Sequence, residues 1–169
     1  MRSVMFMNPR LGIAVLAMLG LSACAEVNLD TAPGAAAGCE DPTEDNLVPQ
    51  APMLPGRSCM ACHRQGGQAS GAVWTASGTV YGSGSSACNS GGLEGVKVEL
   101  ADENRKILIT LYTNRSGNFF TAEPLQYEKL IARVSKDGKI KEMSTPVPSG
   151  DCAGCHNPTG PAGGRIYLN

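Results

Sequence analysis

Two copies of the sequence C-x-x-C-H constrain this chain more than any other feature. They read Cys59-Met60-Ala61-Cys62-His63 and Cys152-Ala153-Gly154-Cys155-His156, and they hold four of the seven cysteines and both histidines. The pattern is typical of covalent haem attachment, in which both thiols form thioethers with the porphyrin and the histidine binds the iron. Two intervening residues let the sulfurs reach both vinyl groups on one porphyrin edge. We therefore expect two c-type haems, one held by Cys59, Cys62 and His63 and one by Cys152, Cys155 and His156.

Three other uses of these residues fit the pattern less well. A zinc site could take the four cysteines, but it would not need a histidine at the same offset in each motif. A thioredoxin-type dithiol needs its motif at a helix start within a βαβ unit, and the sequence has no such pattern. A disulfide between residues three apart is strained and uncommon.

The N-terminus has the features of an export signal, as haem attachment outside the cytoplasm requires. Two arginines accompany an apolar run, Leu11 to Leu21, that is too short to span a bilayer comfortably. The run ends in Leu21-Ser22-Ala23-Cys24, which resembles the lipobox of bacterial lipoproteins. The resemblance implies a signal peptide over residues 1–23, acylation of Cys24 and a lipid anchor in the cell envelope. Because Ala25 follows the cysteine, it also implies the outer membrane, at its periplasmic face or at the cell surface. An ordinary secretory signal with an incidental cysteine is the alternative.

No histidine is left for the far side of either iron, so methionine is the next candidate ligand. Beyond residue 23 the chain has Met53, Met60 and Met143, and Met60 lies within its own motif. Met143 follows Lys139 and Lys141 at every second position, on a polar strand face that needs no methionine for packing. We therefore predict Met143 as an iron ligand, with Met53 as a second candidate. Lysine or tyrosine ligation and an open iron site remain alternatives.

Charge and the remaining cysteines narrow the class of partner. Beyond residue 23 there are 12 basic and 15 acidic residues, since the signal holds two of the 14 basic residues and no acidic one. Because acidic residues outnumber basic ones, the chain offers no basic patch that could bind nucleic acid, and we expect no nucleic-acid partner. Cys39 and Cys88 are left over, and an oxidising compartment favours a disulfide between them. Two free cysteines are the alternative.

Between the motifs, hydrophobic periodicity predicts β-structure. Apolar and polar residues alternate from Val96 to Leu100, and two further runs have apolar residues at every second position, Ile107 to Leu111 and Leu130 to Val134. Turn sequences separate these runs, and Asp137-Gly138 is a strong signal for a two-residue hairpin. No segment beyond residue 23 has a sustained helical period. Trp74, Phe119 and Phe120 are expected in the core or at its rim.

These patterns predict a mainly β protein. We expect a small antiparallel β-sandwich over residues 71–145, flanked by irregular haem-binding segments at 58–70 and 146–169. A disordered tether rich in Pro, Ala and Gly covers residues 24–57. An odd number of strands between the motifs would separate the haems by about a strand length, ~20 Å, whereas an even number would allow them to lie side by side.

Three segments carry a resemblance to a known fold. They are Ser77-Gly78-Thr79-Val80-Tyr81, Leu93-Glu94-Gly95-Val96-Lys97-Val98 and Thr113-Asn114-Arg115-Ser116-Gly117-Asn118-Phe119. With them, residues 73–135 resemble the transthyretin-like or carboxypeptidase-regulatory-like β-sandwich. In that family they are the opening strand, a G-V-x-V strand and the turn before an aromatic core strand. Its members usually act as scaffolds or adhesion modules, so the resemblance implies a fold and no chemistry.

The features together predict an electron-transfer di-haem c-type cytochrome, anchored as a lipoprotein, with a redox protein as donor and another as acceptor. Once both histidines bind iron, no acid, base or nucleophile constellation is left, so we expect no enzyme activity. A five-coordinate haem that acts on peroxide or binds a gas is one alternative. The other is a surface β-sandwich lipoprotein that binds a partner, with motifs that hold haem or zinc only structurally.

Overall fold

The computed structural model describes residues 54–86 and 90–168, which include both C-x-x-C-H motifs. The predicted signal peptide, Cys24, Cys39, Cys88 and Met53 lie outside these residues. None of the helices in the described ranges has the length and apolarity needed to cross a membrane.

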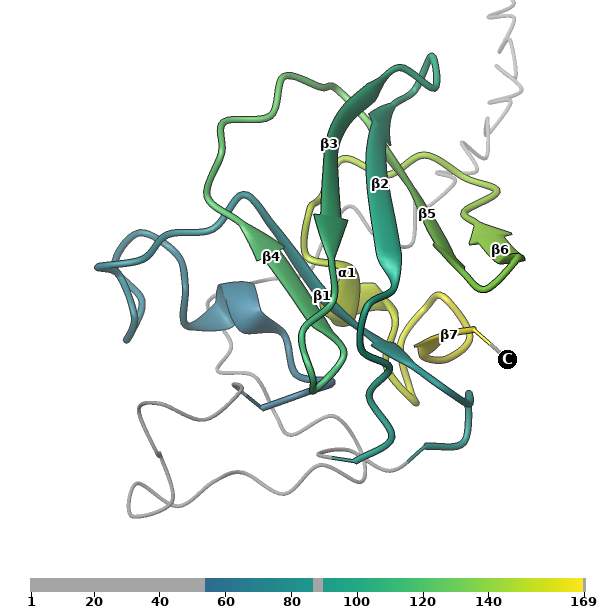
Figure 1. The fold of residues 1–169 in the computed structure, drawn as a ribbon. Coiled ribbons are helices and arrows are strands. Elements are labelled where there is room, and N and C mark those ends of the chain that lie inside the picture. The colour runs from purple at the N-terminus through teal and green to yellow at the C-terminus, as the bar shows by residue number, and fades with distance from the viewer. Residues whose placement is uncertain (1–53, 87–89, 169) are drawn as a thin grey trace, which may run out of the picture.

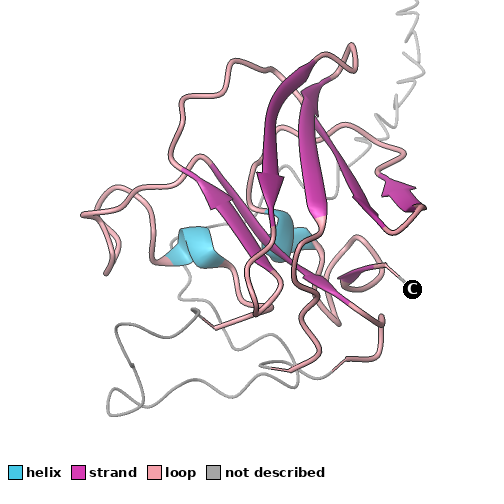
Figure 2. Ribbon diagram, in the orientation of Figure 1, coloured by secondary structure: helices cyan, strands magenta, loops and turns pink. Residues whose placement is uncertain are grey.

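The described residues form seven strands in two sheets, with two single helical turns (Figure 1, Figure 2). One sheet has the strand order β4-β1-β7 and the other has the order β3-β2-β5-β6. The strands are β1 Ala76–Tyr81, β2 Lys97–Asp102, β3 Ile107–Tyr112, β4 Asn118–Thr121, β5 Leu130–Lys136, β6 Lys139–Glu142 and β7 Ile166–Tyr167. The helical turns are η2 Cys59–Ala61 and α1 Cys152–Cys155.

The four-stranded sheet forms where alternation predicts strands. Strand β2 is antiparallel to both neighbours, β3 and β5. The hairpin between β5 and β6 turns through Asp137 and Gly138, whose φ angles are +50° and +79°. Positive φ at both central residues is the mark of a type I′ turn. Lys136 pairs with Lys139 across this turn, which confirms the predicted hairpin.

The three-stranded sheet departs from the prediction at one strand pair. Strands β1 and β4 are antiparallel, as expected, but β7 runs parallel to β1 on its other side. Within residues 71–145 every strand pair is antiparallel, as predicted. The expectation of an irregular segment over 146–169 was wrong, because β7 lies in it and extends the sheet. The reason lies in the path of the chain: β1 follows the first motif, β7 follows the second, and both motifs lie at the same end of the sheet.

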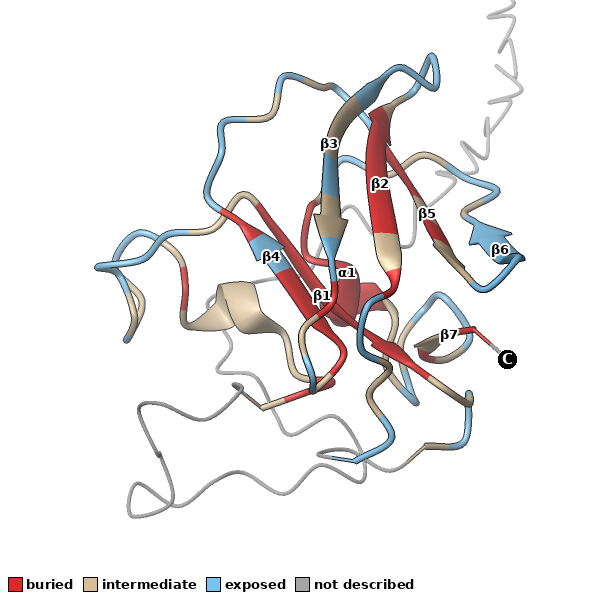
Figure 3. Cartoon of the chain, in the orientation of Figure 1, coloured by how far each residue is buried: buried red, intermediate tan, exposed pale blue. Residues whose placement is uncertain are grey.

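Both sheets line one hydrophobic core, as in a β-sandwich. Val98, Leu100 and Leu130 of the four-stranded sheet join Val80 and Phe119 of the three-stranded one, and each is at most 2% exposed. Full burial of such a side chain stabilises a protein by about 1.5–3 kcal/mol. Figure 3 shows the buried stretches running through the middle of both sheets. The prediction of a mainly β protein is confirmed.

Strand β1 is buried on both faces, since all six of its residues are buried. Ala76 faces the shared core. On the other face Thr79 donates to Asn118 Oδ1 at 2.7 Å and accepts from the backbone N–H of Gly56 at 2.9 Å. Gly56 has a φ of +86°, and a Cβ there would lie 2.2 Å from the Tyr81 hydroxyl oxygen. The chain that enters the first motif is thus pressed onto the outer face of β1.

Phe119 and Phe120 are adjacent on β4, and together they test which face of the three-stranded sheet packs into the core. Phe119→Ala should lower the free energy of unfolding by about 3–5 kcal/mol, because it empties a core position. Phe120 is 48% exposed, so Phe120→Ala should cost only about 0.5–1.5 kcal/mol, the range of one lost aromatic contact. Urea denaturation with an unchanged m-value measures both. Equal losses would contradict the assignment.

Candidate functional site

Both C-x-x-C-H motifs fold into the same helical turn. In the first, the backbone N–H of His63 donates to the carbonyl of Cys59 at 2.9 Å, and in the second that of His156 donates to the carbonyl of Cys152 at 2.8 Å. Residues three and four apart on such a turn lie on one face. Each turn therefore carries the two cysteines and the histidine of its motif at the spacing that a haem held by two thioethers and one iron ligand requires. In the second motif, Cys152 and His156 line one cavity.

The loops behind the two motifs also repeat each other. Six residues after each histidine, the N–H of an alanine returns to the carbonyl of the second cysteine. Ala69 donates to Cys62 at 3.0 Å, and Ala162 donates to Cys155 at 3.3 Å. The sequences of residues 64–69 and 157–162 are otherwise dissimilar. What the two segments have in common is therefore the path of the backbone.

A glycine four residues after each histidine makes this path possible. A Cβ at Gly67 would lie 2.3 Å from the carbonyl oxygen of the second cysteine, and a Cβ at Gly160 would lie 2.1 Å from it. No side chain fits at either position. The eleven-residue pattern C-x-x-C-H-x-x-x-G-x-A therefore occurs twice. The prediction from the sequence did not include this longer repeat, because it took each motif only as far as its histidine.

Each histidine is oriented by a backbone carbonyl from its own loop. His63 Nδ1 lies 2.8 Å from the oxygen of Ala72, and His156 Nδ1 lies 3.2 Å from the oxygen of Gly164. A carbonyl only accepts, so we assign the proton to Nδ1 and the lone pair to Nε2 in both rings. This bond to a carbonyl is typical of metal-binding histidines, because it fixes the ring and its tautomer.

The Nε2 atom of each histidine can offer its lone pair to a metal ion. His63 Nε2 is buried and has no hydrogen-bond partner. An unpaired buried acceptor costs about 1–3 kcal/mol, which a bond from its lone pair would recover. For His156, burial lowers the pKa and favours the neutral ring that carries a lone pair. These residues fit an iron ligand at each motif.

The two motifs meet beside strand β1 (Figure 1). Ser58 and Asp151 immediately precede the two motifs, and the Ser58 hydroxyl donates to Asp151 Oδ2 at 2.5 Å. Asp151 also caps α1 through the Gly154 N–H and forms a bridge with Ser77 of β1. Six strands of the described chain separate the motifs. The motifs therefore lie side by side, as an even number of strands allows.

Cys59, Cys62 and Cys152 are free thiols in this structure. Burial raises the pKa of Cys59 to about 11 and that of Cys152 to about 12. The first cysteine of each motif is therefore protonated at neutral pH and is a slow nucleophile without help. Within residues 54–86 and 90–168, no group of three or more His, Cys, Asp and Glu is placed to hold a metal ion.

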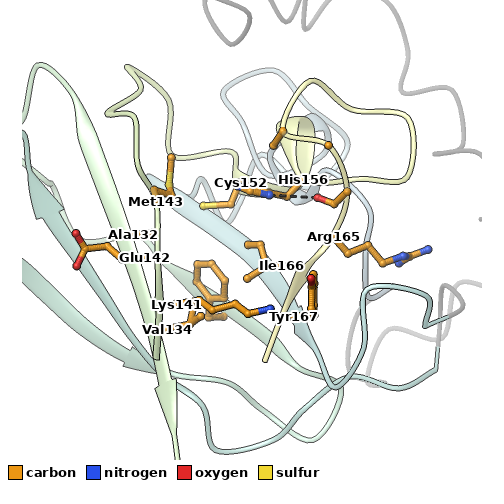
Figure 4. Close-up of a pocket in the computed structure, with 14 residues that line it drawn as sticks. Ala132, Val134, Lys141, Glu142, Met143, Cys152, His156, Arg165, Ile166 and Tyr167 are labelled. Atoms are coloured by element: carbon orange, nitrogen blue, oxygen red, sulfur yellow. Dashed lines mark hydrogen bonds between the residues drawn. The ribbon is translucent and has the colours of Figure 1, made fainter. Parts of the chain in front are cut away.

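A cavity of about 360 Å³ opens beside the second motif (Figure 4). Cys152 and His156 line it together with Met143, which follows the end of β6. Apolar side chains form much of the remaining wall, among them Phe119, Ala132, Val134 and Ile166. Sites for small molecules and cofactors usually measure about 300–1,000 Å³. The structure thus brings one predicted methionine ligand to the second motif.

Met143 does not lie on an outer polar face. Its N–H donates to the carbonyl of Ala132 at 2.9 Å, and its side chain packs against the core. The premise that this face needs no methionine for packing is therefore wrong. Lys141 shares the face and also lines the cavity. Because β6 is an edge strand, where proteins often turn charged side chains inward, its lysines did not mark the solvent side.

Lys141, an exposed residue, supplies a positive charge at the edge of the cavity. Its Nζ lies 3.2 Å from the centre of the Tyr167 ring, which also lines the cavity. Figure 4 shows Arg165 and Glu142 pointing away from the space between the labelled apolar residues. The Arg165 guanidinium lies 4.6 Å from the centre of the Tyr81 ring. Lys141 is thus placed to pair with an anionic group on a molecule bound here.

A stack of aromatic rings begins at the histidine of the first motif. Trp74 stacks on the His63 ring with centres 3.6 Å apart, and Phe120 stacks on Trp74 at 4.3 Å. Phe119 is 2% exposed and fills the core. Of the three aromatics expected in the core or at its rim, two therefore contact the candidate ligand directly or through one ring. The sequence did not predict this stack, because no known motif relates the position of Trp74 to that of His63.

No protein-family model matches the chain, and neither a curated protein nor a solved structure matches it. The resemblance of residues 73–135 to the transthyretin-like sandwich therefore stays a prediction.

Asp151 provides a pH test of the contact between the motifs. Burial raises its pKa, although hydrogen bonds from Ser58 and Gly154 oppose the shift. Its contribution to stability is therefore complete below the unfolded pKa and is lost as pH rises through the folded pKa. Asp151→Asn keeps a capping oxygen but cannot ionise. We expect the stability of the wild type relative to this variant to fall across that acidic window, measured by denaturation at several pH values. A difference independent of pH would contradict the assignment.

Proposed function

We propose that this protein is a di-haem c-type cytochrome that passes single electrons between a protein donor and a protein acceptor. One observation carries the proposal. Each C-x-x-C-H motif is built as a helical turn closed by the same hydrogen bond, and in both the imidazole Nδ1 is bonded to a backbone carbonyl. A dithiol or a disulfide would have no use for two histidines held in one tautomer.

Under this proposal the chain's own residues have distinct tasks. The cysteine pairs tether the cofactor covalently, and each imidazole offers Nε2 to the iron. When bound, the haem supplies reversible one-electron chemistry. Ala72 and Gly164 keep the Nδ1 protons in place through their carbonyls, so a change in iron charge need not release a proton.

At the second motif, Met143 would offer its sulfur to the iron and Lys141 would pair with a haem carboxylate. Both line the cavity that also contains His156. Thioether ligation raises a haem's reduction potential. The second site would therefore have a higher potential than one without a methionine.

The cellular setting rests on the sequence alone. The Leu21-Ser22-Ala23-Cys24 segment favours acylation of Cys24 and a lipid anchor in the cell envelope, at the outer membrane. Residues 25–53 would then separate the domain from the membrane, and a Cys39–Cys88 disulfide would fasten part of that tether. We propose no enzyme activity.

A structural lipoprotein is the second candidate, and one observation favours it. The motif segments cover strand β1 and contribute Cys152 to the core, so a bound haem or metal would stabilise the sandwich even without electron transfer. Reversible reduction by a small redox mediator separates the two functions, because an inert cofactor would not exchange electrons at a useful rate.

The first test counts haems. Expressed with a c-type haem maturation system, the mature protein should gain the mass of two haems and stain for peroxidase activity after denaturation. The variants Cys59→Ala/Cys62→Ala and Cys152→Ala/Cys155→Ala should each keep one haem, and Cys39→Ser should keep both. Intact mass spectrometry reads all four proteins. Wild-type protein without covalent haem would reject the proposal.

The second test concerns Met143. If its sulfur binds iron, the oxidised protein should show a sulfur-to-iron charge-transfer band that Met143→Ala abolishes, with a lower reduction potential. Met53→Ala is the matched variant in the second candidate position. A band retained in Met143→Ala would reject this ligand, whereas loss in Met53→Ala alone would assign it to Met53.

A further inference from the structure

The rings of His63, Trp74 and Phe120 form a continuous stack from the first motif to the surface. The planes of His63 and Trp74 differ by 5° and those of Trp74 and Phe120 by 11°. Phe120 lies on β4 and is 48% exposed, and Val73, beside Trp74 in the chain, is 42% exposed. The other three residues of β4 are buried, and Figure 3 shows one exposed stretch on this strand between buried ones. Two ring contacts thus join the imidazole to solvent.

The segment 72–74 holds His63 in three ways. The Ala72 carbonyl binds Nδ1 at 2.8 Å, the Trp74 N–H donates to the His63 carbonyl at 3.0 Å, and the Trp74 ring covers the imidazole. His156 has the corresponding carbonyl bond, but no stacked ring on it is found in the described part of the chain. The stack is therefore particular to the first motif and is not needed to orient a histidine of this type.

We propose that Trp74 and Phe120 form the electron pathway between the first haem and a redox partner that docks over Phe120. This inference rests on the proposed function. Orbital overlap through stacked rings couples an iron ligand to the surface better than a path through water or saturated side chains. The step moves one electron: the iron bound by His63 goes from ferrous to ferric, and the acceptor is reduced by one electron. No bond breaks, and the Nδ1 proton stays between His63 and Ala72.

The exposed end of the stack indicates the class of partner. Val73, Trp74 and Phe120 carry no charge, so the surface around the exit favours contact with an apolar part of another protein. The partner it fits is a one-electron metalloprotein, of the haem or copper kind, whose cofactor approaches an uncharged surface. Charge would contribute little to this encounter.

A flash-photolysis experiment on the holoprotein tests the pathway without knowledge of that partner. Both native histidines lie in the motifs, so a histidine introduced at exposed Ala122 binds a ruthenium polypyridyl photo-oxidant uniquely. We expect severalfold slower electron transfer from haem to ruthenium(III) when this Ala122→His protein also carries Trp74→Leu or Phe120→Leu. Trp74→Phe should restore most of the rate.

The matched control places the ruthenium at Ile140→His, on the four-stranded sheet. From there the rate should be the same with and without Trp74→Leu or Phe120→Leu. Haem content and reduction potentials are measured first in each protein. Wild type without haem would reject the proposed function and the pathway with it. Two haems with an unchanged rate from Ala122→His in the Phe120→Leu protein would overturn the pathway alone, even if Trp74→Leu fails to fold.

Discussion

The burial of strand β1 on both faces is the constraint on which the rest of the structure depends. Its inner face packs into the core, where Gly78 lets Cys152 approach, since a Cβ at that glycine would lie 3.0 Å from the Cβ of Cys152. Its outer face carries Ser77, Thr79 and Tyr81, and polar groups buried there need partners. The chain before the first motif supplies one at Thr79. Both candidate cofactor sites therefore lie in segments that pack against strand β1. A cofactor bound at either site would stabilise the whole sandwich.

The duplicated site is fixed by backbone groups more than by side chains. After each histidine the chain must bring an N–H to the carbonyl of the second cysteine and a carbonyl to the imidazole Nδ1. Gly67 and Gly160 leave room for the carbonyl of the second cysteine, and Gly66, Gly163 and Gly164 adopt positive φ angles on the way. The other loop residues differ, and each loop ties its first side chain back to its own turn: Arg64 donates to the carbonyl of Ala61, and Asn157 donates to those of Ala153 and Gly154. This explains how segments as unlike as Arg64-Gln65-Gly66 and Asn157-Pro158-Thr159 reach one geometry.

The sequence predicted those parts of the molecule whose structure depends on side-chain properties. Alternation marked β2, β3 and β5 because each has one face in the core, and Asp137-Gly138 marked its turn because few other pairs accept two positive φ angles. Strand β7 has only two residues, too few for a period, and its parallel pairing exists only in the folded chain. The cysteines and histidines of the site could be predicted from their spacing. The carbonyls of Ala72 and Gly164 could not, since every residue has one, and the inward face of Met143 was hidden by the lysines of an edge strand.

The two sites are alike in their turns and unlike in their surroundings, and the difference suggests a division of tasks. His63 is clamped between a carbonyl and Trp74, with a stack that ends at the surface. His156 instead borders a cavity that also contains Met143 and Lys141. On the proposed function, a thioether ligand would raise the potential of the second haem, so an electron would rest there. The first haem, whose ligand is coupled to Phe120, would then be the point of exchange with a partner. The hydrogen bond between Ser58 and Asp151 keeps the two turns adjacent, which such a relay requires.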